Sequence, residues 1–265
     1  MQRNKHNFLR WFDNQAETLT PIPHPLIDDD AENPMPILVP GETSYFYINT
    51  PDFVAIGGTD PVDVKLYTLA GVFVVNVGTA NVLTIQNGAK FHNYGSFTGP
   101  AVADGCYRLQ IGANYSNTVQ IISDAEYIRL NTVVVKFRNN LKSHLFGVYY
   151  AFLPTFYQQF RLPILDNAED VIFDGEVYRA ETTGKERAYS INSKKTRTLT
   201  FAPADKETNE AIETLKQHSL IYVNGIEHAP NLSNIGRLEY DPTLSLNINR
   251  IGLVDNSEAE LNYCQ

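Results

Sequence analysis

Short segments rich in valine, isoleucine, tyrosine and phenylalanine recur along the first half of the chain, separated by turn residues. Turn signals between them include Gly57-Gly58, Gly71, Asn87-Gly88 and Asp104-Gly105. β-Branched and aromatic residues suit the pleated surface of a sheet, whereas glycine and asparagine suit the tight turns between strands. This pattern predicts a β-sandwich of the size of an immunoglobulin-like domain. The expected strands are residues 44–48, 62–68, 72–77, 82–86, 106–111 and 118–122.

The second half of the chain has the same character and predicts a mostly antiparallel sheet with one helix. Asp174-Gly175 and Asn224-Gly225 each fit the turn of a tight hairpin. The helix is expected over residues 206–218, with Ile212 and Leu215 on its buried face and Asp205 as its N-cap. The expected strands are residues 127–138 with 145–152 as its hairpin partner, 171–173, 176–178, 196–201, 222–223, 226–227 and 244–248.

The N-terminal 40 residues differ from the rest because prolines recur around the acidic run Asp28-Asp29-Asp30. Proline removes a backbone donor and forces its predecessor toward extended conformations, so this segment is expected to be irregular. Trp11 and Phe12 belong to a small apolar cluster near its start. The segment is either an extended arm that grips a neighbouring subunit or a disordered tail. We therefore divide the chain into an arm at residues 1–42, a β-sandwich domain at 43–125 and a second β-rich domain at 126–265.

Seven aromatic residues lie between positions 146 and 160, and no charged residue interrupts this stretch. Aromatic side chains dominate the energetics of cores and of protein interfaces, so the stretch must be buried in the fold or against a neighbour. Its first part, residues 145–152, is expected to be a strand with one face in the core. Its second part, with Phe156, Tyr157 and Phe160, is the better candidate for contact with another subunit.

Charge and composition exclude several classes of function. The formal net charge of −9 argues against a general nucleic-acid binder, because phosphate neutralisation needs a basic surface. The uncharged residues 66–89 contain asparagine, glutamine and three glycines, which fit strands better than a membrane span. The N-terminus lacks the apolar core of a secretion signal, so we expect a soluble protein made without one. Cys106 and Cys264 are too few and too far apart for a disulfide framework or a zinc site.

Neither a cofactor nor a metal site is predicted. The six histidines are scattered, and Thr182-Thr183-Gly184-Lys185 lacks the remaining residues of a phosphate-binding loop. The carboxylates at 166–176 could supply the acid and base of a glycan hydrolase, but a solvated acidic rim explains them better. Those carboxylates are Asp166, Glu169, Asp170, Asp174 and Glu176.

A basic strip interrupts this acidic chain. It contains Lys194, Lys195 and Arg197, with Lys185 and Arg187 nearby. The strip is either a charged hairpin exposed to water or a docking surface for an acidic neighbour. The acidic run at residues 28–30 of another copy is a candidate counterpart, because opposite charges on separate surfaces favour oriented association.

Five runs in the second half of the first domain and in the second domain form a recognisable order of strands and turns. They are Gly105-Cys106-Tyr107-Arg108-Leu109, Tyr115-Ser116-Asn117, Val135-Lys136-Phe137-Arg138-Asn139, Phe156-Tyr157-Gln158-Gln159-Phe160-Arg161-Leu162-Pro163 and Tyr222-Val223-Asn224-Gly225. This order resembles that of uncharacterised tail-region proteins encoded by phages and prophages of Bacteroidetes-type bacteria. The similarity covers about residues 100 to 250 and contains no catalytic signature.

The resemblance implies a non-enzymatic component of the virion tail, made in the host cytoplasm and similar in role to distal tail proteins. Such proteins use β-sandwich domains and form rings, often sixfold, with copies of themselves and with other tail proteins. The resemblance supplies no functional residues. The runner-up is a carbohydrate-binding or adhesion β-sandwich that uses exposed tyrosine as a platform for sugar rings, and the third hypothesis is an enzyme. Solvent-facing aromatic residues would favour sugar binding, whereas aromatic residues buried between copies would favour assembly.

Overall fold

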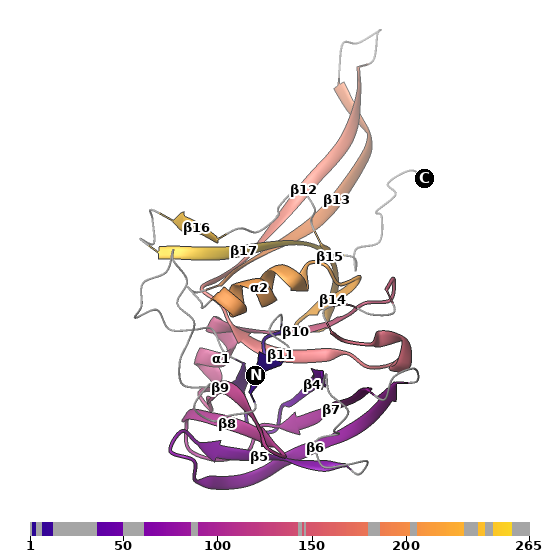
Figure 1. The fold of residues 1–265 in the computed structure, drawn as a ribbon. Coiled ribbons are helices and arrows are strands. Elements are labelled where there is room, and N and C mark those ends of the chain that lie inside the picture. The colour runs from indigo at the N-terminus through magenta and orange to yellow at the C-terminus, as the bar shows by residue number, and fades with distance from the viewer. Residues whose placement is uncertain are drawn as a thin grey trace.

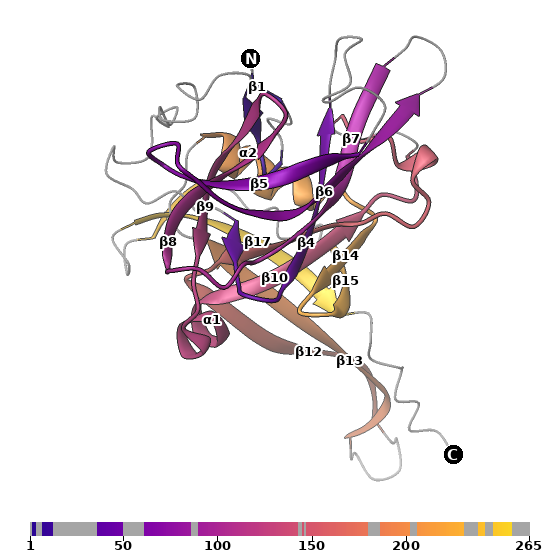
Figure 2. The ribbon, with the colours of Figure 1, turned by 90° about the horizontal axis from the view of Figure 1, so that it is seen from below.

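The computed structural model describes residues 2–3, 7–12, 36–49, 61–85, 90–142, 145, 147–179, 186–201, 206–230, 238–241 and 246–255. The chain is mainly β, as the sequence predicts, and its strands form a large antiparallel sheet. Within the described residues there are two α-helices, α1 (Ala125–Asn131) and α2 (Lys206–Leu215), where the sequence predicts only the second. Figures 1 and 2 show the arrangement from two directions.

Seventeen strands are present in the described part of the chain. They are β1 (Gln2–Arg3), β2 (Trp11–Phe12), β3 (Ile37–Leu38), β4 (Thr43–Asn49), β5 (Val62–Thr68), β6 (Phe73–Ile85), β7 (Lys90–Thr98), β8 (Gly105–Ile111), β9 (Asn114–Ile121), β10 (Thr132–Arg138), β11 (Gln158–Pro163), β12 (Asp166–Arg179), β13 (Glu186–Phe201), β14 (Leu220–Val223), β15 (Ile226–Pro230), β16 (Leu238–Asp241) and β17 (Leu246–Asp255).

The strands of the first half are closed into a circuit by a strand of the second half. Pairing runs antiparallel through β4, β7, β6, β5, β8 and β9, and β3 then lies parallel to β9. Strand β11 pairs with β3 through Arg161 and Ile37 and with β4 through Gln159 and Tyr45. The second half is therefore joined to the first by backbone pairing.

The second half continues from β11 through β10, β14, β15, β17, β13 and β12. Strand β16 pairs with the first residues of β17, on the side opposite β13. Figure 1 shows α2 beside β17, and its residues Ile212 and Leu215 are fully buried, as the sequence predicts. One continuous apolar cluster contains side chains of both halves, among them Leu66, Val135 and Leu199. The two halves thus share a core, while Asp205, the predicted N-cap, lies outside the described residues.

The described parts of the predicted arm belong to the core. Strand β2 pairs with β9, and the fully buried indole of Trp11 lies 5.7 Å from the ring of Phe46. The ring of Phe8 meets those of Phe137 and Phe160 edge to face. The expectation of a loose arm or tail is therefore wrong for residues 7–12 and 36–42, because their apolar side chains fill this core. Residues 13–35, with the acidic run, lie outside the described residues.

Two predicted strand segments are not strands. Residues 125–131 form α1, because the carboxylate of Asp124 caps the helix by accepting from the backbone N–H groups of Glu126 (2.9 Å) and Tyr127 (3.1 Å). The strand predicted from 127 to 138 therefore begins only at Thr132. Leu145 and Val148 form an isolated bridge, and a single 3-10 turn follows at Tyr150–Phe152. Gly147, with φ of 84°, makes that tight reversal accessible.

Two glycine positions that resemble turns lie inside long strands. The segments predicted at 72–77 and 82–86 are one strand, β6, because Gly78 lets the backbone of β7 approach; a Cβ there would lie 2.0 Å from the carbonyl oxygen of Ser96. Asp174-Gly175 is not a turn either, since β12 continues through it to Arg179. The connection to β13 falls within residues 180–185, outside the described residues.

The other hairpin prediction is confirmed. Asn224 (φ 49°) and Gly225 (φ 85°) join β14 to β15, as a two-residue turn with two positive φ angles requires. The Asn224 side-chain oxygen accepts from the backbone N–H of Val134 at 2.9 Å, which ties the turn to β10.

Candidate functional site

A cavity of about 740 Å³ lies where the two halves of the chain meet. One part of its lining comes from β4, β6 and β7, and the rest comes from β10, β11 and residues 152–157. Its volume falls within the range of about 300 to 1,000 Å³ that is typical of small-molecule sites. The second part of the aromatic stretch therefore contributes to a cavity within one chain.

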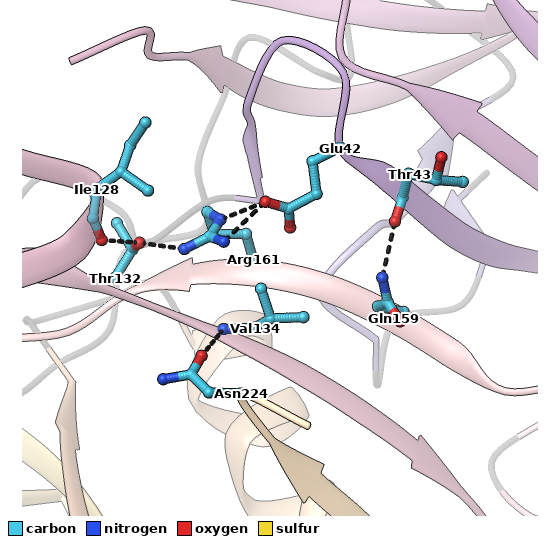
Figure 3. A network of polar contacts seen from close by, with 8 residues as sticks. All are labelled: Glu42, Thr43, Ile128, Thr132, Val134, Gln159, Arg161 and Asn224. Carbon is cyan, nitrogen blue, oxygen red and sulfur yellow. Dashed lines mark hydrogen bonds and ion pairs between the residues drawn. The ribbon is translucent and has the colours of Figure 1, made fainter. Parts of the chain in front are cut away.

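Backbone pairing fixes the relative position of the two parts of the lining. Gln159 of β11 pairs with Tyr45 of β4, and the Gln159 side-chain amide donates to the carbonyl oxygen of Thr43 at 2.8 Å (Figure 3). On β7, a Cβ at Gly95 would lie 2.1 Å from the carbonyl oxygen of Thr79, so only glycine allows the close approach of β6 there.

The first part of the aromatic stretch forms a small apolar cluster over the outer face of β4. Tyr47, Leu145, Val148 and Tyr150 are buried together with Leu153. Leu145, Val148, Tyr150 and Leu153 therefore pack inside this chain, against β4 of the first half. The expected strand with one face in the core is wrong, because these residues form an isolated bridge and a 3-10 turn and their cluster is separate from the main core. Burial raises the pKa values of both tyrosine hydroxyls, so neither ionises in the ordinary pH range.

Aromatic rings continue from this cluster into the cavity. The ring of Phe156 lies 5.8 Å from that of Tyr94 in a T-shaped contact and 6.4 Å from that of Tyr47. Tyr45 and Phe152 also line the cavity, and they keep 40% and 46% of their surface exposed. The cavity thus has a packed aromatic side and an aromatic rim that faces solvent.

Lys136 is the single charged residue among those that line the cavity. Its ammonium lies 4.5 Å from the ring centroid of Tyr157 and 5.7 Å from that of Tyr222, within the range of cation–π attraction. The Tyr222 hydroxyl donates to Glu227 at 3.0 Å. Its pKa is raised to about 12, first by burial and then by this carboxylate, so Tyr222 stays a neutral donor.

A directed chain of hydrogen bonds lies beneath the aromatic cluster. His218 Nδ1 faces the carbonyl oxygen of Thr214 at 3.0 Å, and because a carbonyl only accepts, Nδ1 carries the proton. Nε2 then accepts from the hydroxyl of Tyr150 at 3.1 Å, and that hydroxyl accepts from the amide of Gln158 at 3.1 Å. Asn7 in turn donates to the Gln158 side-chain oxygen. This series of hydrogen bonds connects the N-terminal segment, β11 and α2.

A second polar network ties β11 to its neighbours (Figure 3). The guanidinium of Arg161 donates from Nε to Glu42 Oε2 at 2.8 Å, and its Nη2 lies 2.7 Å from the same oxygen. Nη1 donates to the hydroxyl of Thr132 at 2.7 Å, and that hydroxyl donates to the carbonyl oxygen of Ile128 in α1. Both partners of the ion pair are largely buried, so this network holds the segment before β4 against β11.

The structure separates the aromatic residues predicted for an interface into two groups. Trp11 and Phe160 are fully buried in the core, so their side chains are not available to a partner and that part of the prediction is corrected. Phe12, Phe156 and Tyr157 are partly buried, and the last two line the cavity.

The basic strip lies on β13. Arg197 is buried and pairs with Glu169 of β12, so its charge is neutralised within the chain rather than offered to a neighbour. Lys195 is exposed, and the backbone of Lys194 pairs with Ile172 while its side chain lies outside the described residues.

The remaining chemical candidates are spread along the surface wherever the structure describes their side chains. Asp166, Glu169 and Asp170 are exposed along β12, and the side chains of Asp174 and Glu176 lie outside the described residues. No group of three or more metal-ligating side chains occurs in the part of the chain that the structure describes. None of the helices in the described ranges is long and apolar enough to cross a membrane.

Sequence reasoning missed Tyr45, Tyr94 and Lys136. Each lies in a strand segment that alternates between buried and outward residues, and only the pairing of β11 with β4 brings β10 near β7. In the sequence, each of these residues is marked only as an outward aromatic or basic side chain within an otherwise apolar strand. Many surface strands carry such side chains, so the pattern does not identify a cavity.

Comparisons with protein-family models, with curated proteins and with solved structures found no match for this chain.

Proposed function

We propose that this chain is a non-enzymatic structural subunit of a bacteriophage virion, a tail or baseplate ring or adaptor protein that works through its subunit interfaces. The phage context rests on the resemblance over residues 100 to 250. The role in assembly is supported by one structural feature, the two-stranded ribbon of β12 and β13.

The ribbon extends away from the other strands in both views of the chain (Figures 1 and 2). Its strands pair with each other from Asp166↔Thr200 to Arg179↔Glu186, but only residues 196–201 of β13 also pair with β17. At about 3.3 Å per residue, a strand of 14 residues such as β12 spans roughly 45 Å.

Such a ribbon needs a partner. A two-stranded hairpin is marginally stable alone, and its unpaired edges invite pairing with another chain. Among the described residues, the outer edge of β12 and residues 186–194 of β13 have no further strand partner. Val171, at the start of the projecting part, leaves 47% of its surface exposed. A neighbouring subunit that packs on the ribbon would satisfy both its edges and its apolar residues.

A second exposed surface lies on α1. No residue of this helix is buried, and Tyr127 and Leu130, one turn apart, are exposed. Ring assembly through head-to-tail contacts uses two different patches on each subunit, which the ribbon and α1 would supply.

Removing the ribbon tests the role in assembly. Ile172 and Lys194 face each other in the β12–β13 register, so residues 173–193 can be replaced by an Asn-Gly turn without changing the register of the remaining hairpin. We expect the full chain to form a closed oligomer in native mass spectrometry and the shortened chain to be monomeric with an unchanged melting temperature. A full chain that stays monomeric at high concentration would contradict the assembly role.

The phage context needs its own test. Antibodies against the chain should label one end of the tail of particles released by a strain that encodes it, and proteomics should detect the chain in purified particles. Its absence from such particles would contradict the virion assignment, whatever the oligomeric state.

A further inference from the structure

The geometry points to a carbohydrate site in the cavity between the two halves of the chain, where one or two pyranose rings of a glycan bind against Tyr45 and Phe152. This site goes beyond the proposed function, because neither the ribbon nor α1 contributes to its lining. A subunit could assemble without it.

The aromatic rim supplies the apolar half of sugar recognition. One face of a pyranose ring carries axial C–H groups and packs flat on an aromatic ring. Tyr45 and Phe152 lie on opposite sides of the boundary between β4 and residues 152–157, and both leave more than a third of their surface to solvent. Aromatic area exposed in a concave site is released from water when a ligand covers it, at about 25 cal/mol per Å².

Neutral polar groups supply the other half. The cavity is lined by the hydroxyls of Tyr94, Ser96 and Thr155 and by the amide of Asn81. Tyr94 and Ser96 are half-buried, and Asn81 and Thr155 are exposed, so their polar groups are accessible to a ligand. Hydroxyl and amide groups both donate and accept, which matches the hydroxyls of a sugar, whereas a purely apolar ligand would leave them buried and unpaired.

The lining is held in place before any ligand arrives. Phe156 is packed between Tyr47 and Tyr94, and the Gln159 amide is fixed on the carbonyl oxygen of Thr43. The turn that carries Pro154 and Thr155 is closed by a hydrogen bond from the Phe156 N–H to the Leu153 carbonyl oxygen at 3.1 Å. A preformed site loses less conformational entropy on binding than a flexible one.

The charge of the cavity narrows the ligand class. A single cation, already engaged with two tyrosine rings, is too little for a nucleic acid, which needs several phosphate contacts. The Lys136 ammonium is nonetheless placed to donate to a sugar hydroxyl or to the carboxylate of a uronic acid. Neutral and uronic pyranosides share the same ring chemistry, and a substitution of Lys136 distinguishes them.

The test uses the full chain on an array of neutral and uronic oligosaccharides, followed by calorimetry with the best binder. We expect Tyr45→Ala and Phe152→Ala each to weaken binding at least tenfold. Phe73→Ala on β6 and Leu141→Ala after β10 are the controls, because these side chains are 51% and 85% exposed but lie outside the cavity. Both controls should bind as the unchanged protein does. Lys136→Met should weaken binding of uronic sugars far more than binding of neutral ones.

Three outcomes of the binding measurements would overturn the site. The first is an array on which no oligosaccharide binds above background, and the second is binding that the two controls reduce as much as the cavity variants do. The third is binding of a proline-rich peptide in place of a sugar, because such peptides also bind in grooves lined by aromatic residues. Tyr45→Ala would then abolish binding of the peptide. Native mass spectrometry of Tyr45→Ala separates this test from the proposed function, since the oligomer should be unchanged. Loss of the oligomer would make the cavity a subunit interface and would also overturn the glycan site.

Discussion

The rings of Tyr150 and His218 meet edge to face, with centroids 6.0 Å apart and planes at 86°, and the tyrosine hydroxyl donates to the imidazole at 3.1 Å. The contact fixes the residues that precede the cavity on the end of α2. It also depends on a neutral imidazole, because a proton on Nε2 would face a hydroxyl that is already oriented to donate toward it. Burial disfavours the charged imidazolium and lowers the pKa of His218 to about 4.

Acidification is therefore expected to destabilise the chain through His218. The folded pKa lies below the ordinary value of 6.5, so between pH 6.5 and 4 the unfolded state binds more protons than the folded state. The stability that depends on neutral His218 is fully present above pH 6.5 and is lost as the pH falls to 4. Between pH 7.5 and 5.0 the loss should be about 2 kcal/mol of unfolding free energy. Urea unfolding at both values measures it.

Two variants isolate this effect from the titration of carboxylates. His218→Gln removes the titrating group and should reduce the pH dependence by the same 2 kcal/mol or so. Tyr150→Phe removes the donor but leaves the imidazole buried, so it should lower the stability at pH 7.5 by about 1 to 2 kcal/mol and keep most of the pH dependence. An unchanged slope in His218→Gln would show that other groups cause the acid sensitivity.

Glycine is required where β6 and β7 approach. A Cβ at Gly95 would lie 2.1 Å from the carbonyl oxygen of Thr79, a backbone atom that cannot move aside. We expect Gly95→Ala to lower the unfolding free energy by about 2 to 4 kcal/mol, as strong overpacking does. Ser96→Ala, on the same strand, is the control and should change stability by less than about 0.5 kcal/mol. Chemical denaturation of the two variants compares them directly.

The sequence predicted the strands that alternate clearly and are bounded by real turns, such as those at residues 62–68 and 106–111. It failed where a local signal had two structural meanings. Asp174-Gly175 fits a hairpin turn, yet it lies within β12, because the partner strand β13 continues alongside it. Residues 125–131 contain aromatic and branched side chains that suit a strand, but the cap at Asp124 and the exposed position of the segment favour one short helix.

The cavity was beyond local reasoning for a different reason. Its lining includes Thr43 and Gln159, which are 116 residues apart in the sequence, and the pairing of Gln159 with Tyr45 brings the two parts of the lining together. The aromatic stretch was correctly expected to be buried in part. Phe160 fills the core from within β11, whereas Phe156 lies in the turn segment before β11 begins and lines the cavity. Period-two alternation alone would place these two rings on the same face of one strand.

Asn224 has two roles that substitution can separate. Its backbone adopts φ of 49°, and its side-chain oxygen accepts from the N–H of Val134 in the neighbouring strand β10. Asn224→Asp keeps the acceptor and a residue that tolerates this conformation, so it should cost little. Asn224→Ala leaves the Val134 N–H unpaired and strains the turn, so the unfolding free energy should fall by about 2 kcal/mol. Equal stability of the two variants in thermal unfolding would contradict the role of the side chain.

The ion pair of Arg161 with Glu42 is expected to stabilise the junction between β11 and the segment before β4. Both guanidinium contacts converge on one carboxylate oxygen, and a third nitrogen binds Thr132, so removing either partner leaves the other charge largely buried and unpaired. Glu42→Gln and Arg161→Met should each lower the unfolding free energy by about 2 to 3 kcal/mol, and the double variant by much less than their sum. A double-mutant cycle in urea measures a coupling of at least about 1 kcal/mol if the network joins β11 to the segment before β4. Arg161→Lys keeps the charge but loses the fork that spans Glu42 and Thr132, so it should recover only part of the stability. Additive losses would mean that the pair is a surface contact and that backbone pairing alone holds the two halves together.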